Sequence, residues 1–168
     1  MLTFQDARNI AVAAINKTPA IGDNSGFTII DSATLEKPYA WIFNYNSRLF
    51  LETGDLKYAL GGNAPLFISK IDGKISIFQT GLSIDGMIDK YEEEEHIWQL
   101  ALTDNIYSDN QKLIYLKQAL NLSNNDIAKY KSSNTLVVAT GAMTRLLSLQ
   151  IGFTEKSILT QIYQRDLV

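Results

Sequence analysis

A row of aromatic residues at every second position is the feature that most constrains the fold of this chain. The rings alternate with smaller side chains and so share one face of an extended strand: Tyr39, Trp41, Phe43 and Tyr45. Aromatic side chains dominate the buried area of protein cores, so the row predicts the core of a sheet. In the alternative interpretation, one or two of the rings leave the core and anchor a partner.

An amphipathic helix is expected before this strand. Thr3 and Asp6 have the spacing of a capping box. Apolar residues then recur every three to four positions: Phe4, Ala7, Ile10, Ala11, Ala14 and Ile15. The helix therefore has one apolar face, which we expect to pack on the sheet that contains the aromatic row.

Two further strands are expected as a hairpin. Residues 66–71 and 74–79 are joined by Asp72-Gly73, a pair typical of a two-residue type I′ turn. Residues 48–65 show no regular pattern, apart from one helical turn expected at residues 56–60.

Four consecutive glutamates, Glu92 to Glu95, follow a helix that Ser83 is expected to cap. Adjacent carboxylates repel one another, so this run is expected to be solvated. We place a domain boundary there, with residues 1–94 as the first domain and 95–168 as the second.

The second domain has the expected order βααβαβ. A strand at residues 98–102 precedes two helices whose expected capping pairs are Ser108 with Gln111 and Ser123 with Asp126. A strand at 136–139 and a helix capped by Thr140 and closed by Gly152 follow. Residues 153–163 fit both the helical spacing and the alternation of a strand, and we interpret them as a strand. The whole chain is thus predicted as α+β: an N-terminal helix packed on an antiparallel sheet, followed by a small βααβαβ unit.

Composition removes several classes of function. The chain has no cysteine, so disulfides and thiolate chemistry are excluded, and its 168 residues contain one histidine. A net charge of −3 gives no basic field for nucleic acid. No apolar run approaches the roughly 18 residues of a membrane span, and no secretory signal is visible. We expect a cytoplasmic protein without cofactor or metal.

His96, beside the glutamate run, is the one candidate general base, with Glu94 or Glu95 as its orienting group. No nucleophile motif accompanies it, so we interpret His96 as a residue of the domain junction. The sequence thus predicts no catalytic residues and no enzyme.

Three segments carry a family resemblance: Trp41-Ile42-Phe43-Asn44-Tyr45, Phe50-Leu51-Glu52-Thr53-Gly54-Asp55 and Leu60-Gly61-Gly62-Asn63-Ala64-Pro65. At their relative spacing they resemble the YrhB-like family, also called immunity protein 35, over residues 1–94. The resemblance implies a small α+β domain without catalytic residues. It also implies an immunity protein that neutralises a cognate toxin by binding it.

Residues 95–168 look like the C-terminal domain of the ribosomal stalk protein, which has the order βααβαβ. The glycine-rich turn between its helices is replaced here by Asn121-Leu122-Ser123-Asn124. We therefore transfer the topology and leave factor binding as a remote expectation.

On this basis the expected partner is a cognate toxin, with no nucleic acid or membrane as partner, and the acidic chain suits a basic toxin. The oligomeric state stays open. Long loops on a rigid sheet commonly carry function, so we expect the contact surface on residues 48–63, with the glutamate run as its rim. The candidate residues are Arg48, Phe50, Glu52, Asp55, Tyr58, Asn63, Glu92 and Glu93. The alternative function is a chaperone-like or adaptor module that binds several proteins.

Overall fold

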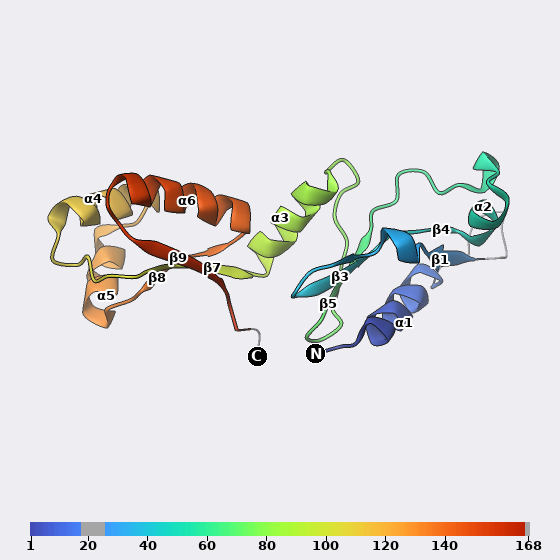
Figure 1. Ribbon diagram of the computed structural model, residues 1–168, viewed down its shortest axis with the longest axis horizontal. Helices are drawn as coiled ribbons and strands as arrows, with labels where there is room; N and C mark the ends of the chain where they lie inside the picture. Colours follow the sequence, from blue (N-terminus) through green and yellow to red (C-terminus); the bar gives the residue numbers. More distant parts are fainter. Residues whose placement is uncertain (18–25, 167–168) are drawn as a thin grey trace. The chain divides into compact units, whose positions relative to one another are not determined.

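The structure is a computed structural model that describes residues 1–17 and 26–166 (Figure 1). Helices and antiparallel sheets are both present, which confirms the predicted α+β class. The described residues form two compact units, Met1–Ser83 and Ile84–Asp166. Each unit contains a hydrophobic core of its own.

Helix α1, Phe4–Ile15, begins at the predicted capping box. The Asp6 amide donates to the Thr3 hydroxyl at 3.2 Å, and the Asp6 carboxylate accepts the Thr3 amide at 3.0 Å. Ala7 and Ala11 are fully buried, and the helix contacts strands β1, β3 and β5 of the first unit. The predicted packing of this helix on the sheet is thus confirmed.

The first unit has two antiparallel sheets. The larger one has the order β2-β3-β5-β6, and the smaller one pairs β1 with β4. Their bounds are β1 Phe27–Ile29, β2 Leu35–Glu36, β3 Ala40–Phe43, β4 Tyr45–Ser47, β5 Leu66–Ser69 and β6 Ile75–Ser76. Short helical segments complete the unit: η1 Asp31–Ala33, α2 Arg48–Thr53 and η2 Leu56–Tyr58.

The aromatic row spans two of these strands. Phe43 is fully buried beneath α1, and Trp41 is covered by Phe4, with ring centroids 5.1 Å apart. Between them and Tyr45 the chain changes sheet at Asn44, whose side chain donates to the Ala33 carbonyl at 2.8 Å. The core interpretation of the row is therefore supported, although the row does not form one continuous strand.

The hairpin of β5 and β6 is present, but its turn differs from the expected one. Ile68 pairs with Ile75, and the Ser69 amide donates to the Lys74 carbonyl at 3.0 Å. The loop therefore contains residues 70–73 instead of a two-residue type I′ turn. Gly73 has φ 72°, the left-handed conformation that glycine adopts without strain.

The second unit has the predicted βααβαβ order after helix α3. Its sheet has the order β8-β7-β9, with β7 antiparallel to both neighbours. The bounds are α3 Ile84–Glu94, β7 Trp98–Leu102, α4 Asn110–Ala119, α5 Asn124–Ser133, β8 Val137–Gly141, α6 Met143–Glu155 and β9 Thr160–Gln164. Leu100, Leu116 and Leu146, all fully buried, lie in its core. The Ser123–Asp126 capping box is confirmed.

Three expected helix signals in this unit are wrong. Asp109, not Ser108, caps α4, because its carboxylate accepts the amides of Gln111 and Lys112. Thr140 lies in β8, and the N-cap residue of α6 is Ala142, whose side chain makes no capping hydrogen bond. Gly152 does not end α6.

Close packing explains the glycine at position 152. A Cβ atom there would lie 2.6 Å from the Tyr115 hydroxyl, so the glycine admits that ring against the helix.

Helix α3 groups with the second unit, where it contacts β8 and α6. The two compact units therefore divide after Ser83, whereas the predicted domain boundary lies within the glutamate run, between residues 94 and 95. Buried Glu92 explains this grouping, since it is 5% exposed and accepts the Met143 amide at 2.9 Å. The expectation that the whole run is solvated is wrong for this residue.

Candidate partner-binding site

Helix α2 lies within residues 48–63, where the sequence pattern predicted no helix at this position. The Phe50 amide donates to the Ser47 hydroxyl at 3.3 Å, which caps the helix at its start. Gly54 ends it in the left-handed conformation at φ 72°, and its amide donates to the Phe50 carbonyl at 2.8 Å. Ser47 and Gly54 are ordinary start and stop signals, so the helix was recognisable from them.

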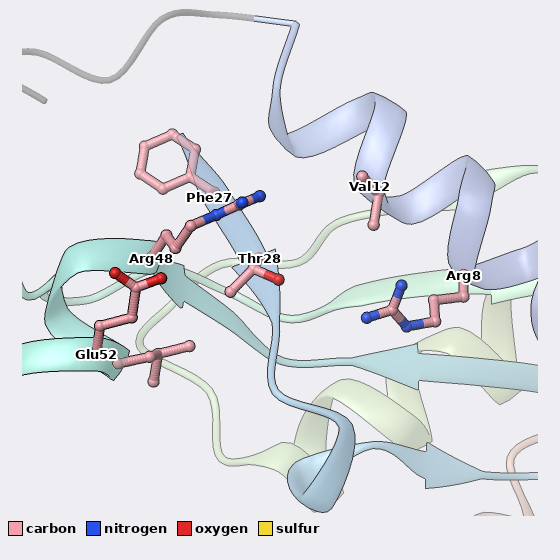
Figure 2. A pocket seen from close by; sticks show the side chains of 7 residues that line it. Arg8, Val12, Phe27, Thr28, Arg48 and Glu52 are labelled. Atoms are coloured by element: carbon pink, nitrogen blue, oxygen red, sulfur yellow. The ribbon is translucent and has the colours of Figure 1, made fainter. Parts of the chain in front are cut away.

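A pocket of about 470 Å³ opens in the first unit where α1, β1 and α2 meet. Figure 2 shows Arg48 and Glu52 on one side of this pocket and Arg8 on the other, with Thr28 between them. The full lining is Arg8, Val12, Phe27, Thr28, Arg48, Leu51 and Glu52. The fold thus brings two candidate residues, Arg48 and Glu52, together with five that the sequence reading did not select.

The charges around the pocket are unequally compensated. Arg8 forms a two-pronged contact with Asp31, with Nε–Oδ1 at 2.9 Å and Nη2–Oδ2 at 3.2 Å. This hydrogen bonding raises the pKa of Arg8. Within the described residues, no hydrogen bond or ion pair engages the guanidinium of Arg48 or the carboxylate of Glu52. Both side chains belong to exposed residues, so they remain available to a partner.

Apolar groups accompany these charges. Phe27 and Val12 line the pocket, and Leu51 on α2 is 42% exposed. Leu56 on η2 is 79% exposed. The pocket can therefore accept a side chain with an apolar stem and a charged end, because Arg48 suits a carboxylate and Glu52 suits a cation.

The rest of residues 48–63 is ordered by its own hydrogen bonds. Asp55 caps η2 and pairs with Lys57 at 2.9 Å, and these contacts with Lys57 lower the pKa of Asp55. The Lys57 ammonium lies 4.6 Å from the ring centroid of Tyr58. Asn63 donates to the Tyr45 carbonyl at 3.0 Å. These candidate residues stabilise the segment, and half-buried Phe50 belongs to α2.

Glu92 and Glu93 belong to the second unit, where both already have partners. The Glu93 carboxylate accepts the Ala142 amide at 2.8 Å and pairs with Arg145 Nε at 3.0 Å. Glu92 accepts the next amide, that of Met143. The two carboxylates therefore cap α6, a role that differs from the expected rim of a contact surface.

His96 makes a hydrogen bond with the hydroxyl of Thr140, with 3.1 Å between Nδ1 and Oγ1. Its backbone has φ 51° in the turn after α3. Within the described part of the chain, no group of three acidic or histidine side chains is arranged to hold a metal ion. None of the described helices has the length and apolar character of a membrane span.

Comparison with known proteins identifies the family of the first part of the chain. A family profile described as "Immunity protein 35" matches residues 5–94. The "Uncharacterized protein YrhB" of Escherichia coli (strain K12) is 40% identical over 52 residues, which are 31% of this chain and 55% of that protein. The chain thus spans about half the length of this curated relative.

No solved structure matches the chain, so the resemblance of residues 95–168 to the ribosomal stalk domain stays a prediction. The resemblance predicted for the first part is confirmed. Since the matching profile covers more than half of the chain, this protein belongs to the immunity protein 35 family.

Proposed function

We propose that this chain is an immunity protein that neutralises a cognate bacterial toxin by direct, non-catalytic binding. The family to which it belongs supports this function. Binding alone blocks a toxin when it covers the active site or the path of the substrate, so the immunity protein needs no reactive group of its own.

We place the contact surface at the pocket of α1, β1 and α2 and on the adjoining residues 54–63. The observation that supports this choice is the pair of uncompensated charges, Arg48 and Glu52, beside exposed Leu51 and Leu56. Arginine is enriched among the residues that supply most of the energy of protein interfaces, and the exposed leucines add apolar area that a partner can bury. Because internal hydrogen bonds hold the surface, little conformational entropy is lost when a partner docks.

Charge also bears on the partner. The chain has a net charge of −3, which favours a basic toxin because opposite fields accelerate encounter. On this proposal a carboxylate of the toxin pairs with Arg48, and a cation of the toxin pairs with Glu52. The toxin is met in the cytoplasm.

Co-expression with the toxin encoded beside this gene tests the proposal. We expect growth to be rescued and the two proteins to co-purify. Failure of both would contradict the proposal. Retention of several unrelated proteins, without protection against the toxin, would identify an adaptor instead.

A further inference from the structure

Strand β9 forms one edge of the sheet of the second unit. Two backbone hydrogen bonds at its ends show which of its residues bond to β7. The Arg165 amide donates to the Ile97 carbonyl, and the Thr103 amide donates to the Leu159 carbonyl. Hydrogen-bonded and non-bonded pairs alternate along an antiparallel ladder. The odd-numbered residues of β9 therefore bond to β7, and the even-numbered residues direct their backbone groups outward.

One of these outward groups has a partner. The Thr160 carbonyl accepts a hydrogen bond from the side-chain amide of Gln150 on α6 at 2.9 Å, which confirms that this even-numbered residue directs its carbonyl away from β7. Within the described residues, nothing bonds to the outward N–H and C=O groups of Ile162 and Gln164. Tyr163 lies between these two residues and is 38% exposed.

Three other sheet edges are less suited to pairing with another strand. Strand β8, at the opposite edge, has a register shift against β7 between Leu100 and Ala101. Strands β2 and β6, which bound the larger sheet of the first unit, have two residues each. Strand β9 pairs with β7 over five regular residues and has no charged residue or proline, the features that usually protect an edge.

Helix α6 adds an apolar surface beside this edge. It contacts β9 and lies along it in Figure 1. Leu147 and Ile151 are 45% and 64% exposed. Residues three apart share a side of a helix, so Leu147 lies near Gln150, on the flank that reaches the β9 edge, whereas Ile151 lies beside Leu147 on the outer side of the helix. Gly152, which packs against Tyr115, marks the other flank.

We propose that β9 pairs with β9 of a second copy of this chain, antiparallel, about a two-fold axis at Tyr163. In this register Ile162 of each copy faces Gln164 of the other, and each such pair exchanges both backbone hydrogen bonds. The two Tyr163 side chains form a close cross-strand pair. The α6 flanks approach across the axis and cover Leu147.

A second copy is the occupant that fits these features, because the unpaired groups of Ile162 and Gln164 are symmetric about Tyr163. The same surface patch on both partners is the defining property of a two-fold interface. One short strand and one helix flank from each copy make a small patch, and interfaces that bury less than about 1,200 Å² in total are typically weak or transient. We therefore expect an equilibrium between monomer and dimer that depends on concentration.

Single cysteines provide the sharpest test, because the chain has none of its own. In the proposed register, cysteines in Tyr163→Cys lie directly opposite each other, within reach of a disulfide. The control is Gln161→Cys, an exposed position on the same strand and sheet face. Its two copies are offset by four residues, about 13 Å at about 3.3 Å per residue.

Under mild oxidation we expect Tyr163→Cys to form linked dimers at least tenfold faster than Gln161→Cys. Equal rates, or a faster reaction of the control, would overturn the register. Sedimentation of the unmodified chain should show a dimer that dissociates on dilution. A monomer at every concentration, or one that associates only when the toxin is added, would overturn the second copy as occupant.

Gln164→Pro then tests the edge itself. Its amide points away from β7, so proline removes an outward donor and leaves the sheet of the unit intact. We expect a monomer with unchanged circular dichroism. Should this variant fail to fold, Tyr163→Lys places like charges opposite each other and should also give a monomer. A dimer that persists in a folded form of either variant would contradict the proposal.

Discussion

The carboxylate of Glu93 accepts a hydrogen bond from the backbone amide of Ala142 at 2.8 Å, and so caps α6 from another helix. Glu92 accepts the next amide, from Met143. The first amides of a helix have no partner within it, and its N-terminus favours negative charge. The adjacent glutamates of α3 thus replace the serine, threonine or aspartate that usually caps a helix.

Removal of this cap should destabilise the second unit. We expect Glu93→Ala to lower the free energy of unfolding by about 1–2 kcal/mol, the usual cost of a lost N-cap. Urea denaturation followed by circular dichroism measures the change. Glu94→Ala is the matched control, because this exposed neighbour makes only a surface ion pair with Lys90 at 3.8 Å. An equal loss in both variants would show that the cap contributes nothing specific.

The same cap should make the free energy of unfolding depend on pH in the acid range. Burial raises the pKa of Glu93, but hydrogen bonds from Arg145 and the Ala142 amide outweigh it, with a smaller contribution from His96, so the pKa is lowered overall. A carboxylate whose pKa is lower in the folded than in the unfolded state stabilises the folded protein at pH values above the unfolded pKa, which is about 4.3 for glutamate. This stabilisation is lost as the pH falls through the folded-state pKa.

In Glu93→Gln the part of the unfolding free energy that depends on ionisation of Glu93 should vanish. The difference in unfolding free energy between wild type and variant should therefore shrink from pH 7 to pH 3. A difference that is constant across this range would exclude Glu93 as the titrating group.

Gly141 should tolerate no side chain. Its φ of 140° is rarely adopted by other residues, and a Cβ atom there would collide with the Glu93 carboxylate and the Arg145 guanidinium. We expect Gly141→Ala to cost about 1–3 kcal/mol of unfolding free energy. Gly61→Ala, with open space around the position, should change it by less than about 0.5 kcal/mol. Thermal unfolding of both variants compares them directly.

His96 should be dispensable for protection against the toxin. It is hydrogen-bonded to Thr140 in a turn with φ 51°, a conformation that asparagine adopts readily. We expect His96→Asn to rescue growth on toxin co-expression as well as the wild type does. A large loss of protection, with the fold intact by circular dichroism, would instead favour catalysis by His96.

Local signals predicted most of the fold. The pairs Thr3–Asp6 and Ser123–Asp126 cap α1 and α5 as their spacing indicated, since both partners lie within one turn. The order βααβαβ followed from the change between helical and strand periods. Gly152 does not end α6 as predicted, because it allows the close approach of Tyr115 from another helix, which no local pattern encodes.

The site was less predictable, because it depends on contacts distant in sequence. Arg48 and Glu52 were selected as part of a loop, but the pocket also needs Arg8 and Phe27 from other elements. Glu93 meets Ala142 across 49 residues, so its charge run resembled a solvated surface. Tertiary packing determines both the lining of the pocket and the role of Glu93, and sequence periodicity carries no information about it.

The affinity of the cognate toxin for defined variants of the full chain tests the proposed binding surface most directly. Isothermal titration should compare wild type with Arg48→Ala, Glu52→Ala and the control Lys131→Ala, which removes an exposed cation from the second unit. We predict that Arg48→Ala and Glu52→Ala each weaken binding by about tenfold or more, roughly 1.4 kcal/mol, whereas Lys131→Ala binds like the wild type. Equal affinities in all four proteins would contradict a contact surface at the pocket of α1, β1 and α2.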